Sequence, residues 1–230
     1  MEERPGTGKL SFFEYQESDV KQSIWIIRHA TRIDVVNPGW KDTAERPFDP
    51  YLAEQGFGEA ATLGALFERE SVERVYCSPF IRAVQTAAPI AEAAGCALRI
   101  EPGLAEWLNR DWFDCVPTLA PQLDPDGFEG EIDLSFVSPV VLTYPESWDA
   151  VMARTLETVT RLAESRENFV LVGHGASVLG CAAALLGTPT PEVPPPPIAS
   201  VYKFTRNGGP WEPQLLADTA HLSAKADRAG

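Results

Sequence analysis

No run of about 18 apolar residues occurs in this chain, which excludes an obvious membrane-spanning helix and predicts no membrane partner. Residues 1–22 also lack the basic and then apolar layout of a signal peptide, so we expect a cytoplasmic protein. Hydrophobic residues still make up 44% of the 230 residues, enough for one full core, and the length is short for two ordinary domains. The sequence therefore predicts a single domain.

Basic residues are scarce. The chain has 19 Lys and Arg against 33 Asp and Glu, a formal net charge of -14. Proteins that hold nucleic acid do so through basic surfaces, so this balance predicts no nucleic-acid partner. A site for a small anion would therefore have to be a local cluster of basic residues on a surface that is otherwise acidic.

Cysteine is also sparse, and no two cysteines have the C-x-x-C spacing of a metal or redox site. Two of the four fall in or beside predicted core elements, which favours free thiols in a reducing compartment over disulfides. The segment Cys77 to Arg82 has one residue too few between Cys and Arg for the loop of cysteine-based phosphatases. The four positions are Cys77, Cys96, Cys115 and Cys181.

Only three histidines are present, and the first one ends the most informative segment of the chain. Residues 24–32 read I-W-I-I-R-H-A-T-R, a buried strand that stops at Arg28 and His29. Residues just past the carboxyl end of such a strand face the crevice where open α/β sheets bind ligands. Guanidinium groups match phosphate oxygens, and a neutral imidazole can attack phosphorus. The pair favours phosphoryl transfer, although an isolated Arg-His dipeptide is common.

The second histidine repeats this design far away in the sequence. Residues 168–177 read N-F-V-L-V-G-H-G-A-S, in which a strand delivers His174 to the start of a helix predicted over 176–186. Backbone amides at a helix start can receive an anion. The third histidine, His221, lies in a polar segment and is interpreted as a solvated side chain.

A third motif, V-Y-C-S-P-F-I-R-A-V-Q-T-A over 75–87, predicts a strand followed by a helix. Ser78 suits a helix cap and Pro79 a first helical position. Arg82 would then fall in the first turn, where a cation is unfavourable unless an anion lies nearby. The alternative is a surface arginine on an amphipathic helix.

A fourth motif, E-P-G-L-A-E-W over 101–107, presents Glu106 beside Trp107. An apolar neighbour favours the protonated carboxyl that a general acid needs. Solvated glutamates are far commoner, so this motif is weak alone.

Together, these four motifs resemble the histidine phosphatase superfamily, in the branch of the cofactor-dependent phosphoglycerate mutases and many phosphomonoesterases. The resemblance makes His29 the phosphorylated nucleophile and Glu106 the proton donor. It also implies a mutase-like three-layer α/β sandwich, with a mostly parallel sheet flanked by helices. Arg28, Arg82 and His174 would form the phosphate pocket.

Within this branch, the chain is similar to the phosphatase domain of the Sts proteins and to ecdysteroid-phosphate phosphatases. The similarity lies in the third and fourth motifs, in Arg32 after the nucleophile, and in P-E-S-W-D-A-V-M-A-R over 145–154. Arg32 would be another phosphate ligand, and Arg154 would support the pocket from outside. The Gly-Glu-Ser that follows the mutase nucleophile is absent, which favours a phosphatase. One departure from the family is Ala30, where the pattern has Gly.

The resemblance implies a metal-independent phosphatase without a cofactor, acting through phosphohistidine on a phosphorylated small molecule or phosphoprotein, with a homodimer possible. Neutral His29 would attack, Glu106 would protonate the leaving group, and the rate would be bell-shaped on the acid side of neutrality. A phosphoglycerate mutase and a noncatalytic phosphate-binding module remain alternatives, the latter because of Ala30. A serine hydrolase is excluded, since Gly175 stands where its nucleophile would be.

The pattern of apolar runs predicts one domain over 23–221 between tails at 1–22 and 222–230. Strands alternating with helices indicate βαβ units and a largely parallel sheet. Residues 109–144, rich in Pro, Asp and Gly with interleaved aromatics, form an insertion interpreted as a lid. The proline run over 189–197 is interpreted as a stiff connector. Strands are expected near 23–27, 74–77, 97–100, 169–172, 200–204 and 214–217, and helices over 53–70, 80–94, 148–166 and 176–186.

Overall fold

The computed structural model describes residues 21–119 and 131–223, and these build a six-stranded sheet. The predicted tails therefore lie almost entirely outside the described residues, as does the middle of the 109–144 insertion. The strands run in the order β3-β2-β4-β1-β5-β6. Their bounds are β1 Lys21–Arg28, β2 Arg74–Cys77, β3 Leu98–Ile100, β4 Phe169–Gly173, β5 Val201–Asn207 and β6 Glu212–Asp218.

The four strands that carry the sequence motifs are parallel. β1 pairs with β4, β4 with β2, and β2 with β3 in parallel, whereas β5 and β6 add an antiparallel edge. The mostly parallel α/β sheet expected from the alternating pattern is thus confirmed. Because parallel strands end at the same edge, β1, β2 and β4 deliver their following residues to one place.

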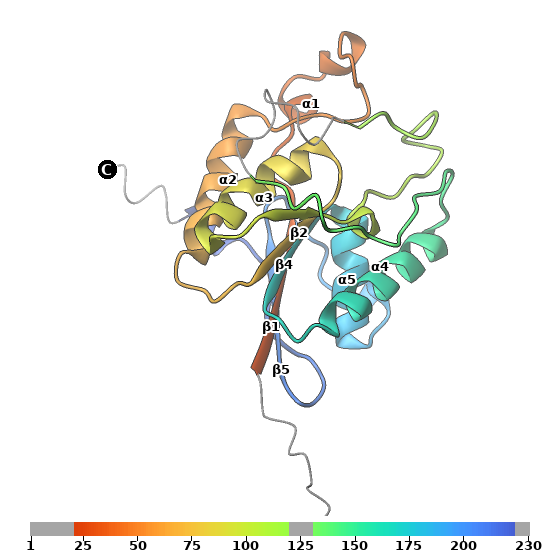
Figure 1. The fold of residues 1–230 in the computed structure, drawn as a ribbon. Coiled ribbons are helices and arrows are strands. Elements are labelled where there is room, and N and C mark those ends of the chain that lie inside the picture. The colour runs from red at the N-terminus through yellow and green to blue at the C-terminus, as the bar shows by residue number, and fades with distance from the viewer. Residues whose placement is uncertain (1–20, 120–130, 224–230) are drawn as a thin grey trace, which may run out of the picture.

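Helices cover both faces of the sheet (Figure 1). Helices α2 and α3 pack together on one face, and α4 and α5 pack together on the other. The helices are α1 Ile33–Val36, α2 Glu54–Phe67, α3 Ile81–Ala94, α4 Trp148–Ala163, α5 Gly175–Leu186 and α6 Ala220–Ser223. None of the helices in the described ranges has the length and hydropathy needed to span a bilayer.

The sequence of β1 explains why both faces are covered. Alternate side chains of a strand point to opposite faces, and here both sets are apolar. Trp25 and Ile27 join the core beneath α2 and α3, whereas Ile24 and Ile26 join the core beneath α4 and α5. All four are at least 96% buried, so the strand ends, and not its faces, are open to a ligand.

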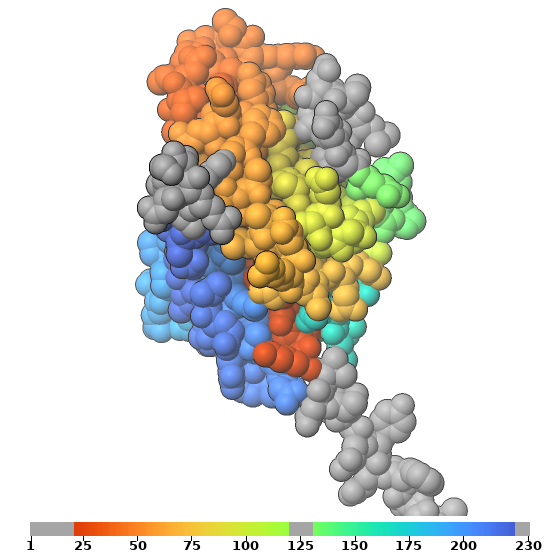
Figure 2. Space-filling view, turned by 90° about the vertical axis from the view of Figure 1, so that its left-hand side faces the viewer, coloured from red at the N-terminus to blue at the C-terminus, as the bar shows by residue number. Residues whose placement is uncertain are grey.

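Helix α2 approaches the loop after β1 unusually closely, at Gly56. A Cβ on Gly56 would lie 2.1 Å from the carbonyl oxygen of Thr31, so only glycine fits there. On the same helix, Glu59 accepts hydrogen bonds from the Thr31 amide and hydroxyl, at 2.9 and 3.0 Å. Helix α2 therefore fixes the loop that directly follows His29. Figure 2 shows the face on which this helix, in orange, lies above the β5–β6 hairpin, in blue.

Two local expectations are wrong. Ser78 and Pro79 do not begin helix α3, which starts at Ile81 with Phe80 as its N-cap. His221 is not solvated: it is 6% exposed, because it lies on the unexpected short helix α6, which packs against α2. All four cysteines are free, as expected.

Candidate active site

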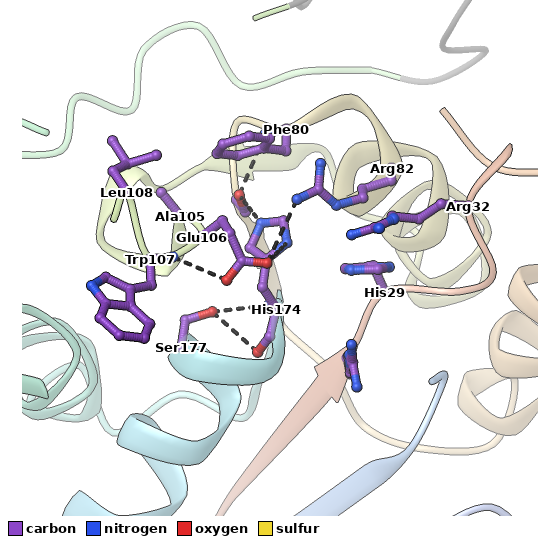
Figure 3. A network of polar contacts seen from close by, with 12 residues as sticks. His29, Arg32, Phe80, Arg82, Ala105, Glu106, Trp107, Leu108, His174 and Ser177 are labelled. Atoms are coloured by element: carbon purple, nitrogen blue, oxygen red, sulfur yellow. Dashed lines mark hydrogen bonds and ion pairs between the residues drawn. The ribbon is translucent and has the colours of Figure 1, made fainter. Parts of the chain in front are cut away.

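The two strand-end histidines lie together. β1 and β4 are adjacent, Arg28 is in register with Gly173, and the His29 amide donates a 2.9 Å hydrogen bond to the Gly173 carbonyl. The imidazole rings of His29 and His174 have centroids 5.2 Å apart, and both side chains are fully buried. Residues 145 positions apart in the sequence thus meet at one edge of the sheet (Figure 3).

The hydrogen bond made by His29 fixes its tautomer. Its Nδ1 lies 2.8 Å from the carbonyl oxygen of Ala30, and since a carbonyl only accepts, Nδ1 must carry the proton. The neutral ring then has its lone pair on Nε2, which has no hydrogen-bond partner within the described part of the chain. Nε2 of His29 therefore has the free lone pair that a nucleophile requires.

His174 lies between a hydroxyl and a carboxyl group. Its Nε2 is 2.7 Å from the hydroxyl oxygen of Ser78, and its Nδ1 is 3.6 Å from Oε2 of Glu106. The backbone amide of His174 donates to Ser177 Oγ, in the first turn of α5, at 2.9 Å. Ser78, which follows β2, thus holds the ring of His174 and does not cap a helix.

Burial dominates the electrostatics of both histidines. Burial, and after it the positive charge of Arg82, lowers the pKa of His29 well below its ordinary value of 6.5. The same two causes, in the same order, lower the pKa of His174. Loss of hydration is thus a larger cause than the neighbouring arginines. Both rings stay neutral on the acid side of neutrality.

This shift predicts how stability depends on pH. Below about pH 6.5 the unfolded chain binds protons at these histidines that the folded chain does not, so the free energy of unfolding falls as the pH falls. Each histidine contributes up to about 1.4 kcal/mol per pH unit until its folded pKa is reached. Urea unfolding of wild type and His29→Ala between about pH 6.5 and pH 5 measures this, and the variant should have the shallower slope. Equal slopes would contradict the neutral, buried state of His29.

Arg82 is the buried cation of the site. Its side chain is 2% exposed, its guanidinium carbon lies 4.5 Å from the Phe80 ring centroid, and Nη2 is 3.7 Å from Oε2 of Glu106. Burial lowers its pKa to about 10, so it is still a cation at neutral pH. Nε and Nη1 donate no hydrogen bond to any described residue, although Nη1 forms a long ion pair with Oδ1 of the buried Asp49, at 3.9 Å. A buried guanidinium with free donors favours a bound anion, as the sequence analysis expected.

Glu106 has different neighbours from those expected. Its Oε1 accepts a hydrogen bond from the Trp107 amide at 3.0 Å, and its Oε2 faces Arg82 and His174. The Trp107 ring instead packs edge-on against Trp112 and Trp148. Glu106 therefore lies at the pocket wall with one oxygen directed to Arg82 and His174.

Arg154 holds the segment that leads into Glu106. Its guanidinium forms a two-point ion pair with Glu146, at 2.7 and 2.8 Å, and donates to the carbonyls of Gly103 and Ala105, at 2.8 and 3.2 Å. These carbonyls belong to the segment that leads into Glu106. Arg154 thus acts outside the pocket, in the supporting role that the sequence analysis proposed.

Arg28 is held by the proline run. Its Nη1 donates to the Pro196 carbonyl at 2.8 Å, and the hydroxyl of Tyr202, on the neighbouring strand β5, donates to the Pro194 carbonyl. The stiff segment predicted over 189–197 therefore positions a guanidinium of the site.

A cavity of about 370 Å³ opens beside these groups. Its lining includes Arg28, Arg32, Arg82 and Glu106, whereas His29 and His174 are fully buried and are not among the lining residues. Sequence reasoning missed several other lining residues, since they come from helix α1 and from the irregular segment between α1 and α2, which have no motif of their own. These are Asp34, Lys41, Pro47, Phe48 and Pro50.

Comparison with known proteins decides the family. The pattern of the histidine phosphatase superfamily (branch 1) matches residues 24–219, nearly the whole described chain. The chain belongs to this superfamily. This match confirms the resemblance to the superfamily that the four sequence motifs predicted.

The relatives are of the expected type. The human ubiquitin-associated and SH3 domain-containing protein B is 28% identical over 54% of this chain and 21% of its own length. The ecdysteroid-phosphate phosphatase of Drosophila melanogaster is 27% identical over 65% of this chain and 20% of its own length. The chain thus spans about a fifth of each of these relatives.

A solved structure supports the fold assignment. The ecdysone phosphate phosphatase of Bombyx mori, in complex with tungstate, has a TM-score of 0.66 and 17% identity. The match covers 86% of this chain and 93% of that one. The two proteins share the phosphoglycerate mutase-like histidine phosphatase fold.

The departure at Ala30 is accommodated within this fold. Ala30 is fully buried and belongs to the core cluster beneath α2 and α3, so its methyl group points away from the pocket. Its amide donates to the hydroxyl of Thr86 on α3 at 3.0 Å. The added Cβ therefore fills core volume, and Ala30 is not among the residues that line the cavity.

Proposed function

We propose that this protein is a metal-independent phosphomonoesterase that acts through a phosphohistidine intermediate on His29. The observation that carries the proposal is the orientation of His29, with Nδ1–H bound to the Ala30 carbonyl and Nε2 unpartnered among the described residues. A neutral imidazole with its free lone pair beside several guanidiniums is suited to attack a phosphate ester. The superfamily assignment supports the same chemistry.

In the first step, Nε2 of His29 forms a bond to phosphorus as the bond from phosphorus to the ester oxygen breaks. The developing charge lies on the equatorial oxygens, and catalysis depends mainly on positioned positive charge. Arg82 offers two buried donor nitrogens, and Arg28 offers a buried Nε, for this purpose. His174 would complete the cradle, and Arg32 would contact it from the exposed side of the cavity.

Glu106 would transfer the proton to the departing oxygen. Its Oε2 lies 3.7 Å from Arg82 and 3.6 Å from His174, beside the groups that would hold the phosphate. In the second step, the carboxylate would accept a proton from water as the water oxygen attacks phosphorus. The His29–phosphorus bond then breaks, releasing inorganic phosphate and neutral His29.

The outer cavity favours a leaving group with an apolar, flat body. Three aromatic residues line it: Phe48, Phe113 and Trp112. Phe48 and Phe113 pack together with their ring centroids 5.6 Å apart, whereas Trp112 is 54% exposed at the mouth. Two of the three belong to the 109–144 insertion, so we propose that this insertion covers the leaving group.

A panel of phosphomonoesters, assayed at several pH values with and without a chelator, tests the proposal. We expect release of phosphate from para-nitrophenyl phosphate and other aryl esters, faster than from glycerol phosphate, and unaffected by the chelator. Binding of vanadate with no turnover of any ester would instead favour a noncatalytic module. Interconversion of phosphoglycerates that requires a bisphosphate primer would favour a mutase.

A further inference from the structure

Three arginines serve the cavity, and the protein holds each of them differently. Arg82 is immobilised by burial, and Arg28 by the Pro196 carbonyl. The side chain of Arg32 is 29% exposed, whereas that of Arg82 is 2% exposed. A long side chain at such a position needs an anchor to stay in one geometry, because ordering it costs rotamer entropy.

Asp34 provides that anchor. Nε and Nη2 of Arg32 donate to the two carboxylate oxygens of Asp34, each at 2.9 Å. Both side chains line the cavity, together with Arg28 and Arg82. The planar fork of a guanidinium matches a carboxylate in this two-point geometry, which fixes orientation as well as distance.

The electrostatics of the site show why an anchor is needed. The charge of Arg32 lowers the pKa of Arg28, Arg82, His29 and His174, so Arg32 lies close enough to act on the other two arginines and on both histidines. Like charges repel Arg32 toward solvent when no anion is bound. The carboxylate of Asp34 offsets this repulsion.

The ion pair leaves Arg32 able to bind phosphate. A guanidinium has five N–H donors, and two suffice for the fork with Asp34. The backbone of Arg32 is held independently by its bridge to Leu52, and the next amide, of Ile33, donates to the Tyr51 carbonyl at 2.9 Å. The side chain is therefore the part that Asp34 controls. Figure 3 shows Arg32 directed toward Arg82 and His29.

We propose that Asp34 is a positioning residue for phosphate binding, which holds Arg32 toward the cavity against the repulsion of the other arginines. The proposal rests on the proposed function, because it assigns phosphate to this cavity. Asp34 touches no reacting atom, and its hydrogen bonds to the site are those with Arg32. Its charge also raises the pKa of Arg82, but as the weakest of the five influences on that group. Its loss should therefore weaken oxyanion binding and raise KM while leaving kcat nearly unchanged.

The test is a double-mutant cycle on Asp34 and Arg32. The measurements are vanadate affinity by titration calorimetry and KM and kcat for para-nitrophenyl phosphate. We expect Asp34→Asn to weaken vanadate binding and raise KM by about fivefold, the effect of an exposed ion pair at the upper end of its range. In the Arg32→Ala background, the same substitution should change either quantity less than about twofold.

Two further variants serve as controls. Asp42→Asn removes the same charge from an exposed position on the neighbouring 3-10 helix Trp40–Asp42 and should leave both constants unchanged. Asp34→Glu keeps the carboxylate and should recover part of the lost affinity, which mere damage to the loop would not allow.

Three results would overturn the proposal. Asp34→Asn could bind vanadate as wild type does, it could bind more tightly because the carboxylate competes with the anion, or its effect could persist without Arg32. Failure of the wild type to hydrolyse any ester would refute the proposed function instead. The vanadate titration would still decide the role of Asp34, since it requires no turnover.

Discussion

Replacing His29 by alanine should lower kcat/KM for para-nitrophenyl phosphate by at least about 10⁴-fold, because the variant has no atom to form the covalent intermediate. Arg82 and its fork of donors stay in place, so the variant should still bind vanadate. A steady-state assay with enough enzyme to detect the residual rate measures the loss.

The matched control is His221→Asn. His221 is also a buried histidine, but it lies on α6 against α2, so its replacement should leave turnover nearly at the wild-type rate. A His29→Ala protein with near wild-type turnover would eliminate the nucleophile assignment. Equal losses in both variants would point to general damage to the fold.

Replacing Glu106 by glutamine should produce the second largest effect, and its size should depend on the leaving group. For an alkyl phosphate such as glycerol phosphate, whose departing alkoxide is strongly basic, we expect kcat to fall about 10²- to 10³-fold. For para-nitrophenyl phosphate, whose phenolate departs without help, formation of the intermediate should change far less. Glutamine retains the acceptor for the Trp107 amide, so the loop keeps its hydrogen bond.

Rapid-quench kinetics distinguish the two steps of this variant. The burst that reports the first step should persist with para-nitrophenyl phosphate, while the slower hydrolysis of the intermediate should be impaired because the base is lost. Glu45→Gln, at an exposed position in the segment between α1 and α2, is the charge control and should behave as wild type does. An equal loss with both esters in the first step would contradict the role of Glu106 as general acid.

The position of the site at the strand ends was predictable, because the topology of a parallel sheet restricts where these ends can lie. Apolar runs before His29 and His174 identify two buried strands, and parallel strands that are neighbours deliver their carboxyl ends to the same edge. The functional groups of the four motifs therefore converge at one edge of the sheet, and Arg32 lies among them while it pairs with Asp34. Short apolar runs also placed most elements to within a few residues.

The rest of the site could not be predicted because it depends on contacts distant in the sequence. Nothing local to Pro196 indicates that its carbonyl will bind Arg28, and Phe48 lies in a loop without periodicity. His221 was misread because a polar neighbourhood predicts exposure, whereas packing of α6 on α2 buries it. For Cys77, by contrast, the prediction from sequence agrees with the structure. The spacing from Cys77 to Arg82 argued against a catalytic cysteine, and burial raises the pKa of the thiol, which disfavours the reactive thiolate.

The central claim is that Nε2 of His29 carries the phosphoryl group during turnover, and trapping that group tests it most directly. The wild-type protein would be mixed with an aryl phosphate, quenched within one turnover under alkaline conditions that preserve phosphohistidine, and mapped by mass spectrometry. We predict one phosphoryl group on the peptide that contains His29, formed during the burst and absent in His29→Ala. Stoichiometric label on Ser78, on His174 or on any other residue, with His29 unmodified, would contradict the account.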